Sequence, residues 1–292
     1  MGSDLTAETW LEVSGVHLEG VVWDDAAGLL RFVDIPRGRV FDATPAAGVS
    51  WFDLPAPITA VHPTTDPATL LIADGDGMAL TSGGVLTERL AAPLADLPEI
   101  RMNDGNVDPA GRYLAGSMAY DATPGAGALY LLDTDRSLHT VLTDVTISNG
   151  LDWSPDGTLC YYADSPTRRI DVFDYDVTTG ALSGRRTFAD TSGLTGIPDG
   201  LTVDADGGVW VAFWGGGCVV RFDTEGQIDQ TVRLPVTQVT SCAFGGPDLD
   251  RLYISTSTED LTPDQLRDQP AAGTVFLAEP GRRGRPSNRF VI

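Results

Sequence analysis

Short apolar segments alternate with polar turns along the whole chain. Six segments follow one plan, in which an apolar strand leads into a turn rich in Asp, Pro and Gly and then into a strand of alternating apolar and polar residues. They begin at Gly20, Ala60, Gly105, Gly150, Gly200 and Cys242. A third strand follows in most of them, as in RVFDAT from Arg39, ALYLLD from Ala128, RIDVFDYD from Arg169, CVVRFD from Cys218 and GTVFLAE from Gly273. The chain is therefore built from a repeated β unit.

Successive repeats start 40 to 50 residues apart, which is the length of one four-stranded propeller blade. The segment TWLEVSG from Thr9 is expected to complete the last blade, because closing the ring removes an exposed sheet edge. The candidate helix is LTPDQLRDQP from Leu261, with Thr262 as N-cap and Pro263 at the first helical position. We predict an all-β fold, a single six-bladed β-propeller domain over residues 1–292.

Composition agrees with this fold and narrows the partners. The chain has 33 Gly and 19 Pro, which suit many turns, and its formal charge of -22 disfavours binding to nucleic acid. No apolar run approaches the ~20 residues of a membrane span, and the start of the chain lacks the features of a signal peptide. We expect a soluble cytoplasmic protein, a monomer or weak homo-oligomer without membrane partners. Cys160, Cys218 and Cys242 are expected to be buried thiols, since their spacing fits neither a disulfide framework nor a zinc knuckle.

Four repeats carry a polar residue at the same position. The last apolar residue before the turn is Trp23, Val107, Trp153 or Val203, and four residues earlier stand Glu19, Asn103, Asn149 and Asp199. The innermost strand of each blade lines the central channel, so these four side chains should form a ring around the axis.

Oxygen-bearing side chains of this kind suit a divalent metal ion on the propeller axis. Carboxylate and amide oxygens are typical ligands of Ca²⁺, Mg²⁺ and Mn²⁺, and Zn²⁺ also accepts carboxylate. Ca²⁺ is the first expectation, with Zn²⁺, Mn²⁺ or Mg²⁺ as alternatives. In a competing interpretation, each residue caps its own strand or turn by bonding nearby backbone.

Three motifs in order resemble the SMP-30/gluconolactonase/luciferin-regenerating-enzyme-like family. They are RMNDGNVDPAGRYLAGSM from Arg101, SNGLDWSPDG from Ser148 and PDGLTVDADGGVWVAFWGGG from Pro198. The resemblance implies that the metal ligands are Glu19, Asn149 and Asp199, and that the substrate pocket holds Arg101, Asn103 and Asp121. At Asp121 the family commonly has Glu, and around Glu19 this chain reads LEGVVW where many members read G-E-[SG]-P-x-W.

The function implied is a metal-dependent lactonase that opens a sugar-acid lactone. The metal would polarise the lactone carbonyl, and Asp199 would act as general base. Two alternatives remain: a metal-dependent esterase or lactonase acting on a non-sugar substrate, and a non-catalytic calcium-binding regulatory protein.

Several other residues invite two interpretations. His17 should share a strand face with Glu19, so it is a binding residue, an ordinary polar residue near the channel mouth or a core histidine whose hydrogen bonds are satisfied within the protein. DADGG from Asp204 and SPDG from Ser154 are predicted to be blade turns, because they lack the remaining ligands of a calcium-binding EF-hand loop. Trp210 and Trp214 are expected to pack between blades.

Overall fold

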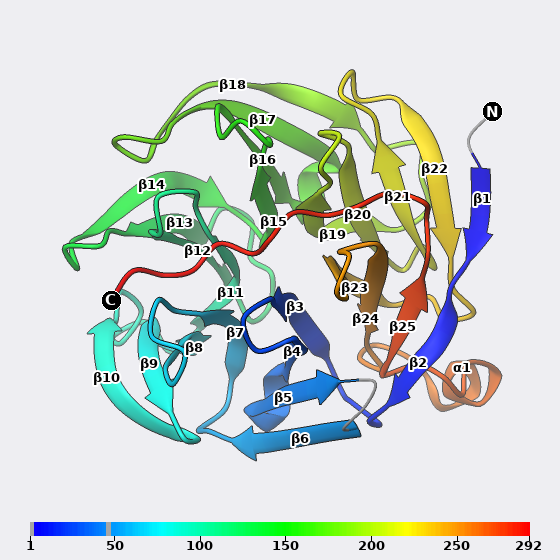
Figure 1. Cartoon of the computed structure of the whole chain (residues 1–292), viewed down its shortest axis with the longest axis horizontal. Helices are drawn as coiled ribbons and strands as arrows, with labels where there is room; N and C mark the ends of the chain where they lie inside the picture. Colours follow the sequence, from blue (N-terminus) through cyan, green and yellow to red (C-terminus); the bar gives the residue numbers. More distant parts are fainter. Residues whose placement is uncertain (1–2, 45–47) are drawn as a thin grey trace.

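In the computed structural model, which describes residues 3–44 and 48–292, six β-sheets surround a central axis (Figure 1). The inner strands, which contact one another around the axis, are β3 (Leu18–Asp24), β7 (Ile58–Pro63), β11 (Ile100–Val107), β15 (Ser148–Trp153), β19 (Ile197–Val203) and β23 (Val239–Gly245). The second strands are β4 (Leu29–Asp34), β8 (Leu70–Asp74), β12 (Tyr113–Ala119), β16 (Leu159–Asp164), β20 (Val209–Trp214) and β24 (Arg251–Thr256).

Two further strands complete each sheet. The third strands are β5 (Arg39–Thr44), β9 (Met78–Ser82), β13 (Gly127–Leu132), β17 (Arg169–Asp176), β21 (Cys218–Phe222) and β25 (Thr274–Ala278). The outer strands are β6 (Gly48–Asp53), β10 (Val85–Ala91), β14 (Leu138–Val145), β18 (Ala181–Asp190), β22 (Ile228–Arg233) and β2 (Glu8–Glu12). The predicted all-β, six-bladed propeller is confirmed.

The N-terminal segment closes the ring, as the sequence predicts. Strand β2 pairs antiparallel with β25 and so forms the outer strand of the last blade. The preceding strand β1 (Ser3–Thr6) pairs in parallel with β22 and becomes a fifth strand of the neighbouring sheet. The sequence gives no sign of this second pairing. By joining two blades, the segment covers two sheet edges that would otherwise be open.

Burial changes from the axis to the rim of each blade. Every residue of β3 is buried, whereas every residue of β6 is exposed or partly exposed. Apolar side chains of neighbouring sheets form the core between blades, where Trp210 meets Phe244 edge to face. Cys160 and Cys242 are buried free thiols, while Cys218 is partly exposed.

The turns between the first two strands are held by their own aspartates. Asp204 Oδ1 accepts hydrogen bonds from the backbone amides of Asp206 and Gly208, both at 2.9 Å. Its Oδ2 accepts from Trp210 Nε1 at 2.8 Å and from Arg221 Nε at 2.7 Å. Because protein donors already occupy both oxygens, DADGG is a blade turn, as expected.

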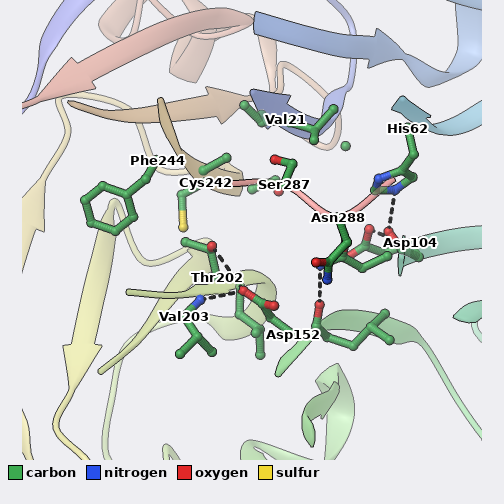
Figure 2. Close-up of a pocket in the computed structure, with 18 of the residues that line it drawn as sticks. Val21, His62, Asp104, Asp152, Thr202, Val203, Cys242, Phe244, Ser287 and Asn288 are labelled. Carbon is green, nitrogen blue, oxygen red and sulfur yellow. Dashed lines mark hydrogen bonds between the residues drawn. The ribbon is translucent and has the colours of Figure 1, made fainter. Parts of the chain in front are cut away.

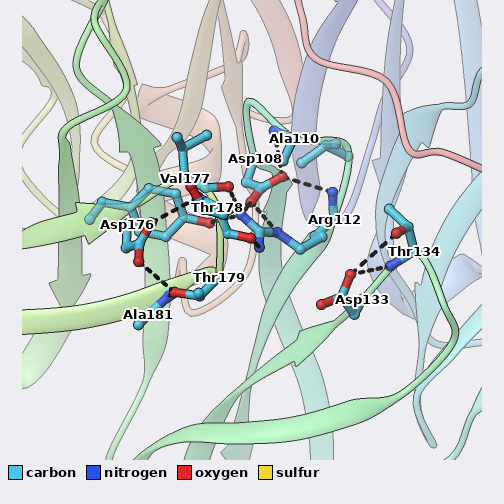
Figure 3. Close-up of polar contacts among 12 residues, drawn as sticks. Asp108, Ala110, Arg112, Asp133, Thr134, Asp176, Val177, Thr178, Thr179 and Ala181 are labelled. Atoms are coloured by element: carbon cyan, nitrogen blue, oxygen red, sulfur yellow. Dashed lines mark hydrogen bonds and ion pairs between the residues drawn. The ribbon is translucent and has the colours of Figure 1, made fainter.

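A buried polar network joins the third and fourth blades (Figure 3). Asp108 is fully buried, and its Oδ2 accepts hydrogen bonds from Arg112 Nε at 2.7 Å and from the Tyr175 hydroxyl. Arg112 Nη2 reaches across the blade boundary and donates to the carbonyl oxygen of Val177 at 2.7 Å. One carboxylate therefore ties the turn after β11 to strand β17 of the next blade.

The C-terminal strap (residues 280–292) crosses the end of the channel where the inner strands finish, as the red trace in Figure 1 shows. Arg285 Nη2 donates to Asp152 Oδ1 at 3.1 Å, and Asn288 Nδ2 donates to the carbonyl of Val107 at 2.8 Å. Phe290 is buried and its amide donates to Pro63 O. A cavity of about 80 Å³ lies beneath the strap (Figure 2). This end of the channel is therefore covered.

The short helix α1 (Pro263–Asp268) begins as predicted. The Thr262 hydroxyl accepts from the Gln265 amide and the Gln265 side chain bonds back to the Thr262 amide, which forms a capping box. In the described part of the chain, no helix combines the length and the apolar character needed to cross a bilayer.

Candidate functional site

Every inner strand carries a register irregularity near its start. In β3 the pairing with β4 passes from Glu19 to Val22, and the other five inner strands skip at the corresponding place. A β-bulge re-aims the side chain at which it occurs. The bulge therefore explains why the four ring residues turn toward the axis. These residues, each four positions before the last apolar residue of its inner strand, are Glu19, Asn103, Asn149 and Asp199.

Glycines allow the inner strands to approach one another at these bulges. Gly20, which follows Glu19, has a φ of 60°, a conformation that side-chain-bearing residues rarely adopt. A Cβ at Gly150, which follows Asn149, would lie 2.5 Å from the amide nitrogen of Leu201 in the next blade. The glycines after Glu19 and Asn149 are therefore required by the backbone, independently of any chemistry at the ring.

A cavity of about 390 Å³ opens over the starts of the inner strands. It is lined by five of the six residues predicted for the site, namely Glu19, Arg101, Asn103, Asn149 and Asp199. The carboxylates of Glu19 and Asp199 lie deep in it, because these residues are only 5% and 6% exposed. The structure thus brings four predicted ring positions and Arg101 into one pocket, at the opposite end of the channel from the C-terminal strap.

Hydrogen bonds fix the two amides of the ring. Asn103 Nδ2 donates to Asn149 Oδ1 at 3.0 Å and to the carbonyl of Ser148 at 2.8 Å. Asn103 Oδ1 accepts from Arg101 Nη1 at 2.6 Å, and Asn149 Nδ2 donates to Ser165 Oγ at 2.8 Å. Both N–H groups of Asn103 are therefore engaged, and its orientation determines where the Asn149 oxygen lies.

The two ring carboxylates are repelled by neighbouring carboxylates, and the nearby Arg101 guanidinium offsets this repulsion only in part. Burial, followed by repulsion from Asp104, raises the pKa of Glu19, and burial together with repulsion from Glu19 raises the pKa of Asp199. Among the described residues, the hydrogen-bond donors to these carboxylates are the backbone amides of Gly20 and Gly200. The competing interpretation, in which each ring residue bonds nearby backbone, therefore holds in part. A backbone amide, however, does not neutralise a buried negative charge.

This donor set fits a hard divalent cation. Within residues 3–44 and 48–292, no group of three His, Cys, Asp or Glu side chains is arranged to hold a metal. A site here would therefore rely on the two carboxylates of Glu19 and Asp199 and on the amide oxygen of Asn149. Such all-oxygen sets suit Ca²⁺ or Mg²⁺, and a divalent charge would relieve the repulsion between the carboxylates.

Aromatic and charged side chains from three blades form one wall of the cavity. His17 Nδ1 is hydrogen-bonded to Glu259 Oε2, which lowers the pKa of Glu259, and the His17 ring stacks on Trp214 at 5.2 Å. The expectation that Trp214 packs between blades is therefore wrong, although it holds for Trp210. Trp214 lies on the same face of β20 as Trp210. Because Trp214 is the last residue of that strand, its ring extends beyond the blade core and is covered by His17.

The structure does not bring Asp121 into the cavity. Its exposed carboxylate accepts hydrogen bonds from the amide and hydroxyl of Thr123, at 3.0 and 2.7 Å. The chain turns after β12 with a φ of 55° at Ala122, so the cavity is lined by Tyr120 and Ala122 instead. The Arg101 guanidinium lies 5.9 Å from the centre of the Tyr120 ring.

Sequence reasoning also missed Glu259 as a lining residue. Glu259 lies in the loop between β24 and α1, outside the repeated inner-strand motif. Tyr120 offered one signal, since it is a large aromatic residue next to a predicted pocket position. For Glu259, the sequence contains no signal that would place it in the pocket.

Comparisons with known proteins show which family and which fold this chain resembles. The model of the SMP-30/gluconolactonase/LRE-like region matches residues 18–258. Regucalcin from Oryctolagus cuniculus is 40% identical over 265 residues, which cover 88% of this chain and 89% of that protein. A solved structure from Agrobacterium tumefaciens, described as the calcium-binding protein regucalcin, has 31% identity and a TM-score of 0.94 over 100% of both chains.

A more distant structure shares the fold. The gluconolactonase XC5397 from Xanthomonas campestris is 22% identical, with a TM-score of 0.73 over 90% of this chain and 86% of that one. The extent of the family match and the identity to regucalcin together show that this chain belongs to the SMP-30/gluconolactonase/LRE-like family.

Proposed function

We propose that this chain is a metal-dependent hydrolase that opens a sugar-acid lactone to the aldonic acid. Membership of a family that includes gluconolactonases is consistent with lactonase activity. The observation that carries the proposal is the pair of buried carboxylates, Glu19 and Asp199, at the base of an open cavity that also holds Arg101. The size of the cavity is within the usual range for small-molecule sites.

Glu19, Asn149 and Asp199 would hold the cation. When bound, a divalent cation supplies Lewis-acid stabilisation of the charge that develops on the lactone carbonyl oxygen. Asp199 accepts the proton of the attacking water, since its carboxylate lines the base of the cavity where the cation and the lactone would meet. Ca²⁺ is the proposed ion, because the three ligands all offer oxygen.

Arg101 and Asn103 orient the substrate in different ways. Among the described residues, Arg101 donates through Nη1 to Met102 O and Asn103 Oδ1, which leaves its other guanidinium N–H groups for a substrate hydroxyl or ring oxygen. Asn103 has no free N–H, so it offers a substrate only its remaining oxygen lone pair. Its main contribution is to fix the position of the Asn149 oxygen.

A lactone panel tests this function and its alternatives. Glucono-, galactono-, xylono- and arabinono-lactone are assayed by acid release with and without chelator, beside an aryl ester. Lactone turnover that chelator abolishes supports the proposal. Turnover of the aryl ester alone would indicate a non-sugar esterase. Calcium binding without any turnover would indicate a regulatory binding protein.

Metal addition is expected to stabilise the protein. Because a ligand that binds only the folded state adds stability by mass action, a free metal concentration about 100 times the dissociation constant should add about 2.7 kcal/mol. Thermal melts of chelated protein and of protein saturated with Ca²⁺, Mn²⁺ or Zn²⁺ measure the gain. In Glu19→Gln the gain should shrink, and an unchanged Tm in wild-type protein with every metal would exclude the site.

Arg101→Ala is expected to lower kcat/KM for a sugar lactone by about 10- to 100-fold, since a hydrogen bond to a charged donor is lost. Metal affinity should not weaken, because Arg101 is a cation near the site rather than a ligand. Arg186→Ala removes an exposed arginine that pairs with Asp174 and serves as the matched control. Weaker metal binding in Arg101→Ala, measured by calorimetry, would contradict the assignment of Arg101 to substrate alone.

A further inference from the structure

The cavity has one wall whose polar side chains are not needed for the proposed chemistry. This wall, here called the His17 wall, consists of His17, Trp214 and Glu259. They come from three blades: His17 precedes β3, Trp214 ends β20 and Glu259 follows β24. Arg101, on β11, belongs to the third blade, which stands across the ring from the blade that carries Glu259.

The His17 ring is held in a single orientation. Its Nδ1 is bonded to the Glu259 carboxylate, and the ring stacks on Trp214 with an angle of 18° between the planes. The backbone is fixed too, since the His17 amide donates to Asp34 Oδ1 at 3.0 Å. Glu259 is anchored in turn, because its amide donates to Ser257 Oγ at 2.9 Å. An imidazole constrained in this way is preorganised for a ligand.

The second ring nitrogen of His17 faces no protein partner. In the described chain no hydrogen bond to Nε2 is formed, although the side chain is only 15% exposed and lines the cavity. Since a carboxylate only accepts, the proton of a neutral ring lies on Nδ1 and the lone pair on Nε2. The nearby carboxylates of Glu259 and Asp260 are acceptors as well, whereas the indole Nε1 of Trp214 is a donor.

Acceptors such as His17 Nε2 and the carboxylates of Glu259 and Asp260 complement a ligand that presents hydroxyl groups. We propose that His17 is a substrate-binding residue whose Nε2 accepts a hydrogen bond from a hydroxyl group of the sugar lactone. Glu259 and Trp214 are positioning residues that hold the ring in place. This inference rests on the proposed lactonase function and extends it, because it assigns a hydroxyl-specific contact to the wall opposite Arg101.

The test compares two lactones in His17→Phe, which keeps a ring to stack on Trp214 but removes the acceptor. For glucono-δ-lactone, KM should rise about tenfold, the value of one lost hydrogen bond, with kcat nearly unchanged. For δ-valerolactone, which has no hydroxyl groups, kcat/KM should stay the same. His139→Phe changes an exposed histidine of β14 and is the matched control. Equal losses on both lactones, or none on either, would overturn the proposal.

A binding measurement separates this proposal from the lactonase function. D-mannitol is titrated calorimetrically into chelated and Ca²⁺-loaded protein, so that no turnover is needed. Binding about tenfold weaker in His17→Phe than in His139→Phe supports the contact even if no lactone is hydrolysed. Equal binding in the two variants, or no binding to wild-type protein, would overturn it, whereas lactone turnover itself could still stand.

The positioning role of Glu259 has its own readout. Glu259→Gln keeps an oxygen that accepts from Nδ1–H, whereas Glu259→Leu removes it. KM for glucono-δ-lactone should rise in Glu259→Leu and return toward the wild-type value in Glu259→Gln. The same loss in both variants would mean that the charge of Glu259, rather than the orientation of His17, determines binding.

Discussion

Asp199→Asn is expected to lower kcat for a sugar lactone by about 10² to 10⁴-fold even when metal is saturating, the range typical of a lost general base. The substitution keeps the size of the side chain and one oxygen that can act as a ligand, but it removes the negative charge and the basic site. Asp199 is suited to both roles, because it is buried in the cavity and receives, among the described residues, a single hydrogen bond from the backbone amide of Gly200. Activity measured as a function of metal concentration tests the expectation.

The metal titration separates the two roles of Asp199. If Asp199 acts only as a ligand, the loss should follow metal occupancy, and high metal concentrations should restore most of the activity. Asp206→Asn is the matched control, because Asp206 is an exposed aspartate paired with Arg282. Near-normal kcat in fully metallated Asp199→Asn protein would eliminate Asp199 as the base.

Asp108→Ala is expected to reduce the free energy of unfolding by about 3–5 kcal/mol, the usual cost of breaking a buried ion pair from one side. Asp108 is fully buried, and Arg112 is 4% exposed at its side chain, so the substitution leaves a buried guanidinium without its carboxylate. Two turn amides and the Tyr175 hydroxyl also lose their acceptor (Figure 3). Chemical denaturation of wild-type and variant proteins measures the difference.

An exposed ion pair provides the control for this stability loss. Asp174→Ala breaks the pair with Arg186, whose side chains are 60% and 48% exposed, and should cost less than about 1 kcal/mol. Replacing both buried partners, as in Asp108→Ala with Arg112→Leu, should recover part of the stability. Equal losses in Asp108→Ala and Asp174→Ala would show that burial of the network does not matter.

The ring positions could be predicted because their pattern is local. Each inner strand, its bulge and its following turn recur within a repeat, so Glu19, Asn103, Asn149 and Asp199 fall into one register. Their convergence then follows from the closed propeller alone. The hydrogen bond between Asn103 and Asn149 could not be predicted, because it depends on the distance between blades and on amide orientation.

Residues outside the repeat were harder to place. The sequence places Asp121 and Tyr120 side by side, but the direction of the turn after β12 decides that Tyr120 lines the cavity and Asp121 faces away. Similarly, the parallel pairing of β1 with β22 depends on where the chain runs after the ring is closed.

The sequence by itself determined the repeated β unit, the six blades, the closing strand β2 and the four polar positions that face the axis. Strand alternation and turn chemistry are encoded by neighbouring residues, so these features can be read within one repeat. Only the tertiary structure decided that Glu259 meets His17, that Trp214 faces the cavity and that the C-terminal strap covers the far end of the channel. These contacts join segments up to 265 residues apart, and their formation depends on loop packing between blades rather than on any local pattern.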